Sequence, residues 1–349
     1  MTSTILASEA AREIERLLQY GRRHGLIDQW DVIPVRNALL DLFRLDVPYS
    51  GVVPEEHLEG PEAILANLLD YAAQSGLMQA DTVTNRDLLD ARIMGLLMPR
   101  QSEVVRRFRR MAQERSIEAA TDDFYRMSIA SNYIRMDRVR NNLYWLADTD
   151  YGQLEITVNL SKPEKDPKEI AMLKTLPPTE TRYPLCQLCL DNVGYAGRPD
   201  HPARQNHRVI PLALAGETWY FQYSPYVYYN EHCIIFHERH VPMQITPQTF
   251  ERLLEAVRQL PHYFVGSNAD LPIVGGSILN HDHFQGGRHV FPMEKAGSEA
   301  EYAHPDYADV RVVIVRWPMS VIRLASPDSN RLTALASHIL DRWKEYDDP

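Results

Sequence analysis

The residues best suited to chemistry stand close together in the last third of the chain. His281, His283 and Gln285 occupy alternate positions in the sequence. If the segment from Ser277 to Gln285 is extended, these three side chains and that of Ser277 project from one face, because side chains alternate along a strand. Two imidazoles and an amide make a poor core surface, so this face is predicted to form a functional site.

Glycine pairs bracket this segment, at 275–276 and 286–287. Glycine lets the backbone approach a ligand closely, and free amides near it can hold phosphate oxygens. Gly275, Gly276 and Ser277 are therefore expected to receive the phosphates of a substrate.

Histidine allows two kinds of chemistry here. Neutral imidazole is the commonest nitrogen ligand for metals. It can also attack phosphorus to form a phosphoramidate, which divides one displacement into two. Gln285 can donate an amide hydrogen bond to a phosphoryl oxygen, whereas a carboxylate at that position would repel the phosphoryl group. The two kinds of chemistry can be divided between His281 and His283.

A second constellation is the C-x-x-C motif formed by Cys186 and Cys189. This motif occurs in zinc sites and in redox pairs, and zinc is favoured because the surrounding sequence lacks the strand-to-helix setting of a thioredoxin motif. Two thiols without a metal are the alternative. Two thiolates need two further ligands. His281 and His240 could supply them, although His237 and His232 compete with His240.

Polar and aromatic side chains lie between these two constellations. One cluster consists of Arg198, Arg204, Asn206, His207 and Arg208. It could bind phosphate or carboxylate oxygens, because arginine is suited to forked recognition of such groups. The alternative is that these residues belong to a solvated loop. The aromatic segment 219–231 could stack against a base or a sugar, but sheet core is favoured.

Composition restricts the class of protein. The 349 residues include 37 Lys and Arg against 47 Asp and Glu, a net charge of −10, which argues against general affinity for nucleic acid or an anionic membrane. No apolar run approaches the roughly 20 residues that span a bilayer, and the N-terminal segment lacks the apolar core of a signal peptide. Three cysteines are too few for a disulfide framework and suit a reducing cytosol, so a cytoplasmic location is expected.

The first half of the chain is predicted to be helical. Apolar residues recur there at helical spacing, in the segments 7–20, 33–45, 62–76, 84–97 and 104–111. Thr84 is predicted to be the N-cap of the fourth segment. The basic run in the fifth is interpreted as a solvated helix face rather than a nucleic-acid patch.

Near residue 150 the pattern changes from helices to strands. Residues 152–160 alternate between polar and apolar, and further strands are predicted within 218–229, 233–236 and 310–324. One helix, which Thr246 caps and Pro247 begins, interrupts them. The sequence therefore predicts an α+β fold, with a helical N-terminal region at 1–148 and a sheet-containing region at 149–349.

Several segments resemble the class II galactose-1-phosphate uridylyltransferases of bacteria, which belong to the histidine-triad superfamily. The resemblance covers essentially the whole chain and is carried chiefly by Phe221-Gln222-Tyr223-Ser224-Pro225-Tyr226, Tyr229-Asn230-Glu231-His232, the stretch from Gly266 to Ser277, and His281-Asp282-His283-Phe284-Gln285-Gly286-Gly287. It implies a histidine-triad-like antiparallel sheet with packed helices in the region 149–349.

The resemblance also implies an activity. The family exchanges uridylyl between UDP-glucose and galactose 1-phosphate, giving glucose 1-phosphate and UDP-galactose through a uridylyl-histidine intermediate. In the class I motif His-Pro-His-x-Gln the second histidine is the nucleophile, which maps to His283, with Gln285 as the donor to the phosphoryl group. Uridine is expected near Asn206, Arg208 and Asn268.

A structural zinc ion is the one cofactor that the resemblance implies, and no organic cofactor is expected. Its ligands would be Cys186, Cys189, His240 and His281. UDP-sugars and hexose 1-phosphates are the expected partners, nucleic acid and membranes are not, and a homodimer is one predicted assembly.

The sequence departs from the family pattern at two places. Asp282 replaces the class I proline between the histidines, and its side chain is expected to point away from them, without a catalytic role. The chain ends at Pro349, where family members usually continue, which predicts a C-terminally truncated chain. The alternatives to the transferase are an inactive or regulatory UDP-sugar-binding protein of the same fold, or another histidine-triad nucleotide hydrolase or phosphorylase.

Overall fold

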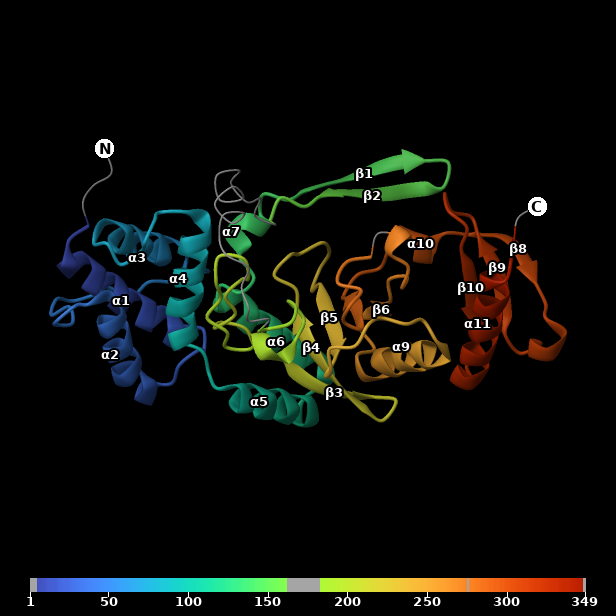
Figure 1. The fold of residues 1–349 in the computed structure, drawn as a ribbon, viewed down its shortest axis with the longest axis horizontal. Coiled ribbons are helices and arrows are strands. Elements are labelled where there is room, and N and C mark those ends of the chain that lie inside the picture. Colours follow the sequence, from blue (N-terminus) through green and yellow to red (C-terminus); the bar gives the residue numbers. More distant parts are fainter. Residues whose placement is uncertain (1–4, 162–182, 275, 348–349) are drawn as a thin grey trace. The chain divides into compact units, whose positions relative to one another are not determined.

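The chain forms two compact units. The computed structural model describes residues 5–161, 183–274 and 276–347 (Figure 1). Unit 1 consists of residues 1–141, 160–210 and 222–227, and unit 2 consists of residues 142–159, 211–221 and 228–349. The two regions expected from the sequence, 1–148 and 149–349, remain a prediction of the domain organisation.

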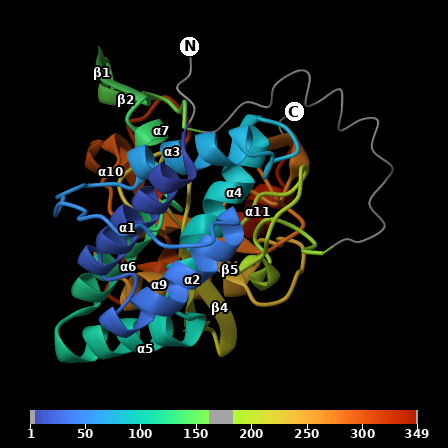
Figure 2. The same cartoon turned by 90° about the vertical axis from the view of Figure 1, so that its left-hand side faces the viewer.

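Helices make up most of the described residues up to Asn141, as the spacing of the apolar residues there predicts. Ile14 and Leu17 of the first helix and Ile64 and Leu68 of the third are completely buried, and α1 packs against α2 and α3 (Figure 2). The α-helices in the described part of unit 1 are α1 (Ala7–Arg23), α2 (Val32–Phe43), α3 (Glu62–Gln74), α4 (Val83–Leu96), α5 (Gln101–Glu114), α6 (Ile117–Ala130) and α7 (Met136–Val139).

The N-terminus of α4 corrects one prediction. Thr82, not Thr84, is the N-cap, and its hydroxyl oxygen accepts a hydrogen bond from the backbone N–H of Asn85 at 3.2 Å. Both threonines precede the apolar pair Leu88 and Leu89 of this helix, and an N-cap needs an extended backbone. Thr82 has it, with φ −122° and ψ 158°, whereas Thr84 lies inside the first turn.

The basic run that is predicted to be a solvated helix face lies in α5. In α5, Val104 and Phe108 are buried while Arg106, Arg109 and Arg110 are exposed, so the basic run is a solvated helix face. Among the described residues, no helix is both long enough and apolar enough to cross a bilayer.

A partly buried group of charges connects α4 to the segment that contains α7. Asp87 accepts two hydrogen bonds from Arg138, at 2.6 and 2.9 Å, and is also paired with Arg135. Asp90 is 5% exposed and accepts a hydrogen bond from Asn132 at 2.9 Å. Burial raises the pKa of Asp90 to about 6, although the positive charge of Arg135 opposes this shift.

We expect the Asp90→Asn variant to differ from the wild type in the pH dependence of its stability. A carboxyl whose pKa is raised by folding stabilises the protein fully below its unfolded pKa, and this contribution is lost as the pH rises through the folded pKa. Relative to the variant, the wild type should lose about 3 kcal/mol of unfolding free energy between roughly pH 4 and pH 6. Urea denaturation across this range measures the difference. The exposed Asp46→Asn variant is the control, and parallel pH profiles for wild type and Asp90→Asn would contradict the prediction.

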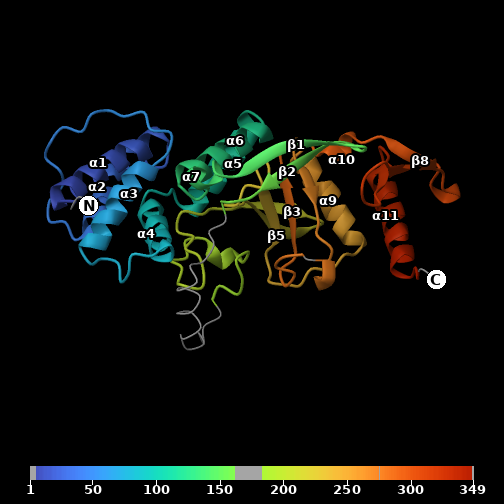
Figure 3. The same ribbon diagram turned by 90° about the horizontal axis from the view of Figure 1, so that it is seen from above.

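Unit 2 contains a hairpin and two antiparallel sheets. In the hairpin, β1 (Leu143–Thr149) pairs with β2 (Gly152–Val158) in antiparallel register (Figure 3). The predicted strand at 152–160 is confirmed as β2. The sequence analysis missed β1, because its apolar residues are consecutive and do not alternate.

The larger sheet carries the candidate catalytic segment. Its strand order is β3-β4-β5-β7-β6, from β3 (Ile210–Leu214), β4 (Glu217–Tyr223), β5 (Cys233–His237), β6 (Phe264–Gly266) and β7 (His283–Gly287). β7 runs antiparallel to both β5 and β6. The rings of Trp219 and Phe284, both fully or nearly fully buried, stack 4.9 Å apart in its core.

The described part of unit 2 also contains a second sheet and three α-helices. The sheet has the order β10-β9-β8, from β8 (Ser298–Tyr302), β9 (Arg311–Val315) and β10 (Ile322–Ala325), and is antiparallel. The helices are α9 (Pro247–Gln259), α10 (Pro292–Lys295) and α11 (Ser329–Lys344), and α9 packs against β6 and α11. The structure thus confirms a mixed α+β fold with antiparallel sheets.

The segment before β7 differs from the prediction. The strand begins at His283, and residues 277–281 form a bend and a turn, in which Ile278 has a φ of +56°. A left-handed residue interrupts an extended chain, so the strict alternation of faces does not reach back to Ser277. The prediction that Ser277 shares one strand face with the two histidines and Gln285 is therefore wrong.

Candidate active site and metal centre

The first residue of β7, His283, is a buried imidazole with a defined tautomer. Its side chain is almost completely buried, and its Nδ1 lies 2.8 Å from the carbonyl oxygen of His281. A carbonyl can only accept, so the ring proton is on Nδ1 and the lone pair is on Nε2. Burial lowers the pKa of His283, which favours the neutral ring. Neutral imidazole with its lone pair on Nε2 is the form that attacks phosphorus.

The amide of Gln285, two residues further along β7, is oriented by two neighbours. Its oxygen lies 3.2 Å from Nε2 of His232, and its nitrogen donates a hydrogen bond to Oδ1 of Asn268 at 3.5 Å. Because an amide oxygen only accepts, His232 carries its proton on Nε2. The amide nitrogen of Gln285 therefore points away from His232 and toward Asn268, and it is a hydrogen-bond donor.

The sequence analysis gave His232 no catalytic or positioning role and weighed it only as a competing metal ligand. Its ring is 3% exposed and lies 4.7 Å from the ring of Tyr229, measured between centroids. The only signal in the sequence was its place directly before β5, and β5 pairs with β7. That pairing brings His232 beside Gln285, which the sequence alone does not reveal.

The predicted phosphate-binding segment is described only in part. Gly275 lies outside the described residues, and Ser277 is exposed in the bend before β7. At Gly276, an added Cβ would lie 2.7 Å from Cδ2 of Leu279 and 3.2 Å from the carbonyl oxygen of Ala269. Close packing of the segment 268–269 against this turn is therefore sufficient reason for a glycine there.

The two thiols of the C-x-x-C motif have a separation suited to a metal. The Sγ atoms of Cys186 and Cys189 are 3.6 Å apart. Two sulfurs bonded tetrahedrally to zinc at about 2.3 Å are separated by about 3.8 Å, whereas a disulfide requires about 2.05 Å. Asn192 holds the loop by donating to the carbonyl oxygens of both cysteines at 2.8 Å, and its own Oδ1 is 2.7 Å from Nε2 of His201.

The two candidate histidine ligands flank the start of β7 and the end of β5. His281 is completely buried, and its Nε2 lies 2.8 Å from the carbonyl oxygen of His237, which places the ring proton on Nε2 and the lone pair on Nδ1. A backbone carbonyl that fixes the tautomer in this way is typical of metal-ligating histidines. The ring of His240 is 5.1 Å from that of His281.

The competing residue His237 is engaged differently. Its Nδ1 lies 3.0 Å from the backbone nitrogen and 3.2 Å from the carbonyl oxygen of Arg239, and its Nε2 lies 3.7 Å from Oε1 of Glu217. His240 is therefore the better candidate. With His281, Cys186 and Cys189 it makes up a Cys2His2 set that could hold a metal ion.

Asp282, between the two histidines, lies among charged groups. Its carboxylate is 3.7 Å from Nη1 of Arg252. Burial raises the pKa of Asp282, although Arg252 opposes this shift. Arg252 also forms an ion pair with Glu217 at 2.6 Å. The absence of a catalytic role for Asp282 stays a prediction.

The two predicted uridine-binding residues of unit 1 already have backbone partners. Asn206 is buried and donates to the carbonyl oxygen of Ser131 at 2.9 Å. Arg208 donates to the carbonyl oxygens of Pro99, Gln205 and His207 at 2.7–3.0 Å. Burial lowers the pKa of Arg208 to about 10. Their role toward uridine stays a prediction.

The aromatic segment 219–231 divides into two parts. Trp219, Phe221 and Tyr223 are completely buried, which confirms sheet core for β4. Tyr228 is 48% exposed, and with Tyr229 it lines a cavity.

Comparison with known families decides where the chain belongs. The model for the N-terminal domain of galactose-1-phosphate uridyl transferase matches residues 18–242, and the model for its C-terminal domain matches residues 255–346. The chain belongs to the galactose-1-phosphate uridyl transferase family. No solved structure matches it significantly.

Individual members of the galactose-1-phosphate uridyl transferase family are close in sequence. A galactose-1-phosphate uridylyltransferase of Caldanaerobacter subterraneus subsp. tengcongensis is 62% identical over 97% of this chain and 65% of its own length. Those of Halalkalibacterium halodurans and Bacillus subtilis are 52% and 48% identical, over 98% and 96% of this chain and 67% and 65% of their own lengths. The chain thus spans about two-thirds of the length of these relatives.

Proposed function

We propose that the protein transfers UMP from UDP-glucose to galactose 1-phosphate by a ping-pong mechanism through a uridylyl-histidine intermediate. The observation that carries this proposal is the buried imidazole of His283, whose Nδ1–H is held by the carbonyl of His281 and whose pKa is lowered by burial. The names of the family's close members support it. The proposal includes a histidine-triad-like arrangement for the sheet that contains β7, and a cytoplasmic location.

In the first half-reaction, Nε2 of His283 attacks the α-phosphorus of UDP-glucose. A P–N bond forms, and the P–O bond to the β-phosphate breaks. Glucose 1-phosphate leaves with the electron pair, and a phosphate leaving group needs little protonation. The ring becomes a uridylyl-imidazolium, and its Nδ1–H donates a strengthened hydrogen bond to the His281 carbonyl.

In the second half-reaction, a phosphate oxygen of galactose 1-phosphate attacks the same phosphorus. The P–N bond breaks, and neutral His283 returns. The amide nitrogen of Gln285 donates to the phosphoryl oxygens while charge develops on them. The backbone amides at 275–277 receive the phosphates, and Asn206, Arg208 and Asn268 lie near the uridine.

We further propose that zinc is the metal of the Cys2His2 set formed by Cys186, Cys189, His240 and His281. Thiolate and imidazole are the donors that zinc prefers, and four protein ligands leave no position for an activated water, so the ion is structural. His281 links this set to the reaction, because its carbonyl oxygen accepts from Nδ1 of His283.

Incubation with UDP-glucose alone, followed by denaturation and intact-mass analysis, tests the proposed function. A mass increase equal to one uridylyl group, mapped to His283, is expected because no acceptor is present to remove it. If UDP-glucose binds in a separate titration but no adduct forms, the transferase proposal is wrong and a UDP-sugar-binding protein is favoured.

Replacing Gln285 with alanine should slow adduct formation by about 10²–10³-fold, the usual effect of removing one donor to a developing oxyanion. Replacing the positioning residue His232 with phenylalanine should slow adduct formation less, because the variant keeps a ring and loses only the donor to Gln285. Rapid quenching of the reaction with UDP-glucose gives both rates. If Gln285→Ala forms the adduct at the wild-type rate, the amide does not act on the phosphoryl group.

A further inference from the structure

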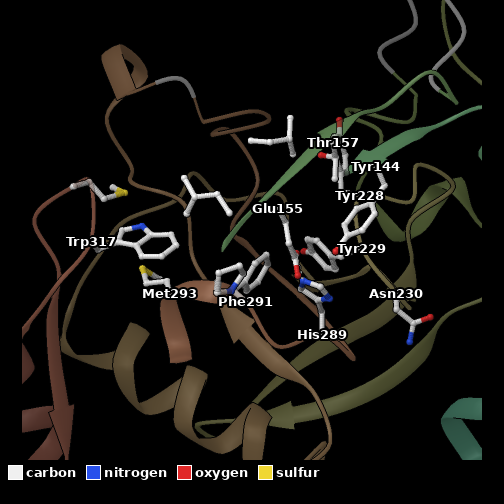
Figure 4. A pocket seen from close by; sticks show the side chains of 14 residues that line it. Tyr144, Glu155, Thr157, Tyr228, Tyr229, Asn230, His289, Phe291, Met293 and Trp317 are labelled. Carbon is white, nitrogen blue, oxygen red and sulfur yellow. Dashed lines mark hydrogen bonds and ion pairs between the residues drawn. The ribbon is translucent and has the colours of Figure 1, made fainter. Parts of the chain in front are cut away.

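Unit 2 contains a cavity with a volume of 610 Å³ that the mechanism above does not use (Figure 4). This volume lies in the range of small-molecule sites, about 300–1,000 Å³. Residues of the β1–β2 hairpin, the segment 228–230, the segment 289–293 and the turn after β9 line it. These segments are far apart in the sequence, so only the folded unit creates the cavity.

The walls of this cavity are mostly apolar and aromatic. Figure 4 shows the rings of Tyr229, Phe291 and Trp317 around it, with the thioether of Met293 beside them. The rings of Tyr229 and Phe291 meet edge to face, 5.5 Å apart between centroids. Flat apolar walls of this kind pack against the C–H face of a sugar ring as well as against a base.

The charged group among the polar residues that line the cavity is a carboxylate held by an imidazole. Oε2 of Glu155, on β2, lies 2.7 Å from Nε2 of His289, and both side chains are only 20% exposed. The second carboxylate oxygen, Oε1, still has acceptor capacity for a ligand. Figure 4 shows this pair beside the ring of Tyr229, which stacks on the His289 ring 5.9 Å away.

A carboxylate selects among the parts of a sugar nucleotide. It repels phosphate, because both are anionic. It also suits uracil poorly, because uracil presents two carbonyl oxygens beside its one N–H. Hydroxyl groups of a sugar can donate to a carboxylate and accept from a neighbouring donor. The neutral hexosyl ring is therefore the part that fits.

The cavity is connected to the catalytic amide by direct contacts. Tyr229 lines the cavity and packs against His232, with 4.7 Å between ring centroids. His232 in turn is hydrogen-bonded to Gln285. At Gly287, the end of β7, an added Cβ would lie 2.8 Å from the Tyr229 ring, so the strand and this cavity wall are in close contact.

We propose that this cavity binds the hexosyl ring of the sugar phosphate, with Glu155 accepting hydrogen bonds from ring hydroxyls and the aromatic walls packing against the ring. This inference rests on the proposed function, because it assigns the hexose end of the same substrates. The residues proposed to bind the hexosyl ring, Glu155, Tyr229 and Trp317, are different from the proposed catalytic residues His283 and Gln285.

Binding measurements with unreactive ligands test this assignment. Galactose 1-phosphate and UDP are each titrated calorimetrically into the wild type and into Glu155→Gln, and neither ligand alone allows turnover. Loss of a hydrogen bond to a charged group should weaken galactose 1-phosphate binding by about 10- to 100-fold, while UDP binding stays unchanged. Trp317→Leu should also weaken the binding of galactose 1-phosphate selectively, because the contact with the sugar ring is lost while the Glu155–His289 pair is unchanged.

The matched control is Glu299→Gln, which removes an exposed carboxylate of β8 and should change neither affinity. Unchanged galactose 1-phosphate binding in both Glu155→Gln and Trp317→Leu would overturn the assignment. Weakened UDP binding in these variants would overturn it too, because the cavity would then take the uridine. A wild type that binds both ligands but forms no uridylyl adduct would instead refute the proposed function, so the two failures are distinguishable.

Discussion

The His283→Ala variant is expected to form no uridylyl adduct and to lose turnover by about 10⁶-fold, the size of effect seen when a covalent nucleophile is removed. The ring of His283 is buried, and its hydrogen bond to the His281 carbonyl leaves the lone pair on Nε2. UDP-glucose binding should remain nearly intact, because the nucleophile contributes to the transition state and little to ground-state affinity. Intact-mass analysis and calorimetric titration measure the two effects.

His57→Ala is the matched control for this prediction, since it removes an exposed imidazole of unit 1. It should form the adduct at the wild-type rate. An adduct that persists in His283→Ala, or an equal loss of binding and turnover, would show that another residue is the nucleophile.

The Cys186→Ser/Cys189→Ser double variant is expected to lose the metal and much of the stability of the protein. Serine hydroxyls do not replace thiolates as zinc ligands, and the free energy of metal binding is also free energy of folding. A loss of several kcal/mol should lower Tm by about 10 °C or more. Elemental analysis of the purified protein and scanning calorimetry measure both quantities.

The third cysteine provides the control. Cys233 is completely buried on β5, and Cys233→Ser should keep its zinc even where the buried hydroxyl lowers stability. Equal zinc contents in the double variant and the wild type would exclude the two thiols as ligands. Zinc loss should also slow the formation of the uridylyl adduct, because His281 is both a proposed ligand and the acceptor for Nδ1 of His283.

Predictions that rest on short-range patterns agree with the structure. The helices of unit 1 follow from apolar spacing, and β2 follows from strict alternation. The C-x-x-C loop brings its two Sγ atoms to 3.6 Å within four residues. The choice of Thr84 instead of Thr82 as a cap shows the limit of such patterns, because neighbouring threonines differ only in a backbone conformation that the sequence does not state.

The sequence by itself determined which residues can do chemistry here: two histidines and a glutamine at alternate positions, and a pair of thiols at the spacing of metal ligands. These are properties of residue type and local spacing. Only the tertiary structure decided how they are oriented. The turn at Ile278 separates Ser277 from the strand, and the pairing of β5 with β7 places His232 against Gln285. The cavity around Glu155 and His289 joins residues 134 positions apart. Such contacts depend on which strands and loops become neighbours, and that is set by packing of the whole unit rather than by any local stretch of sequence.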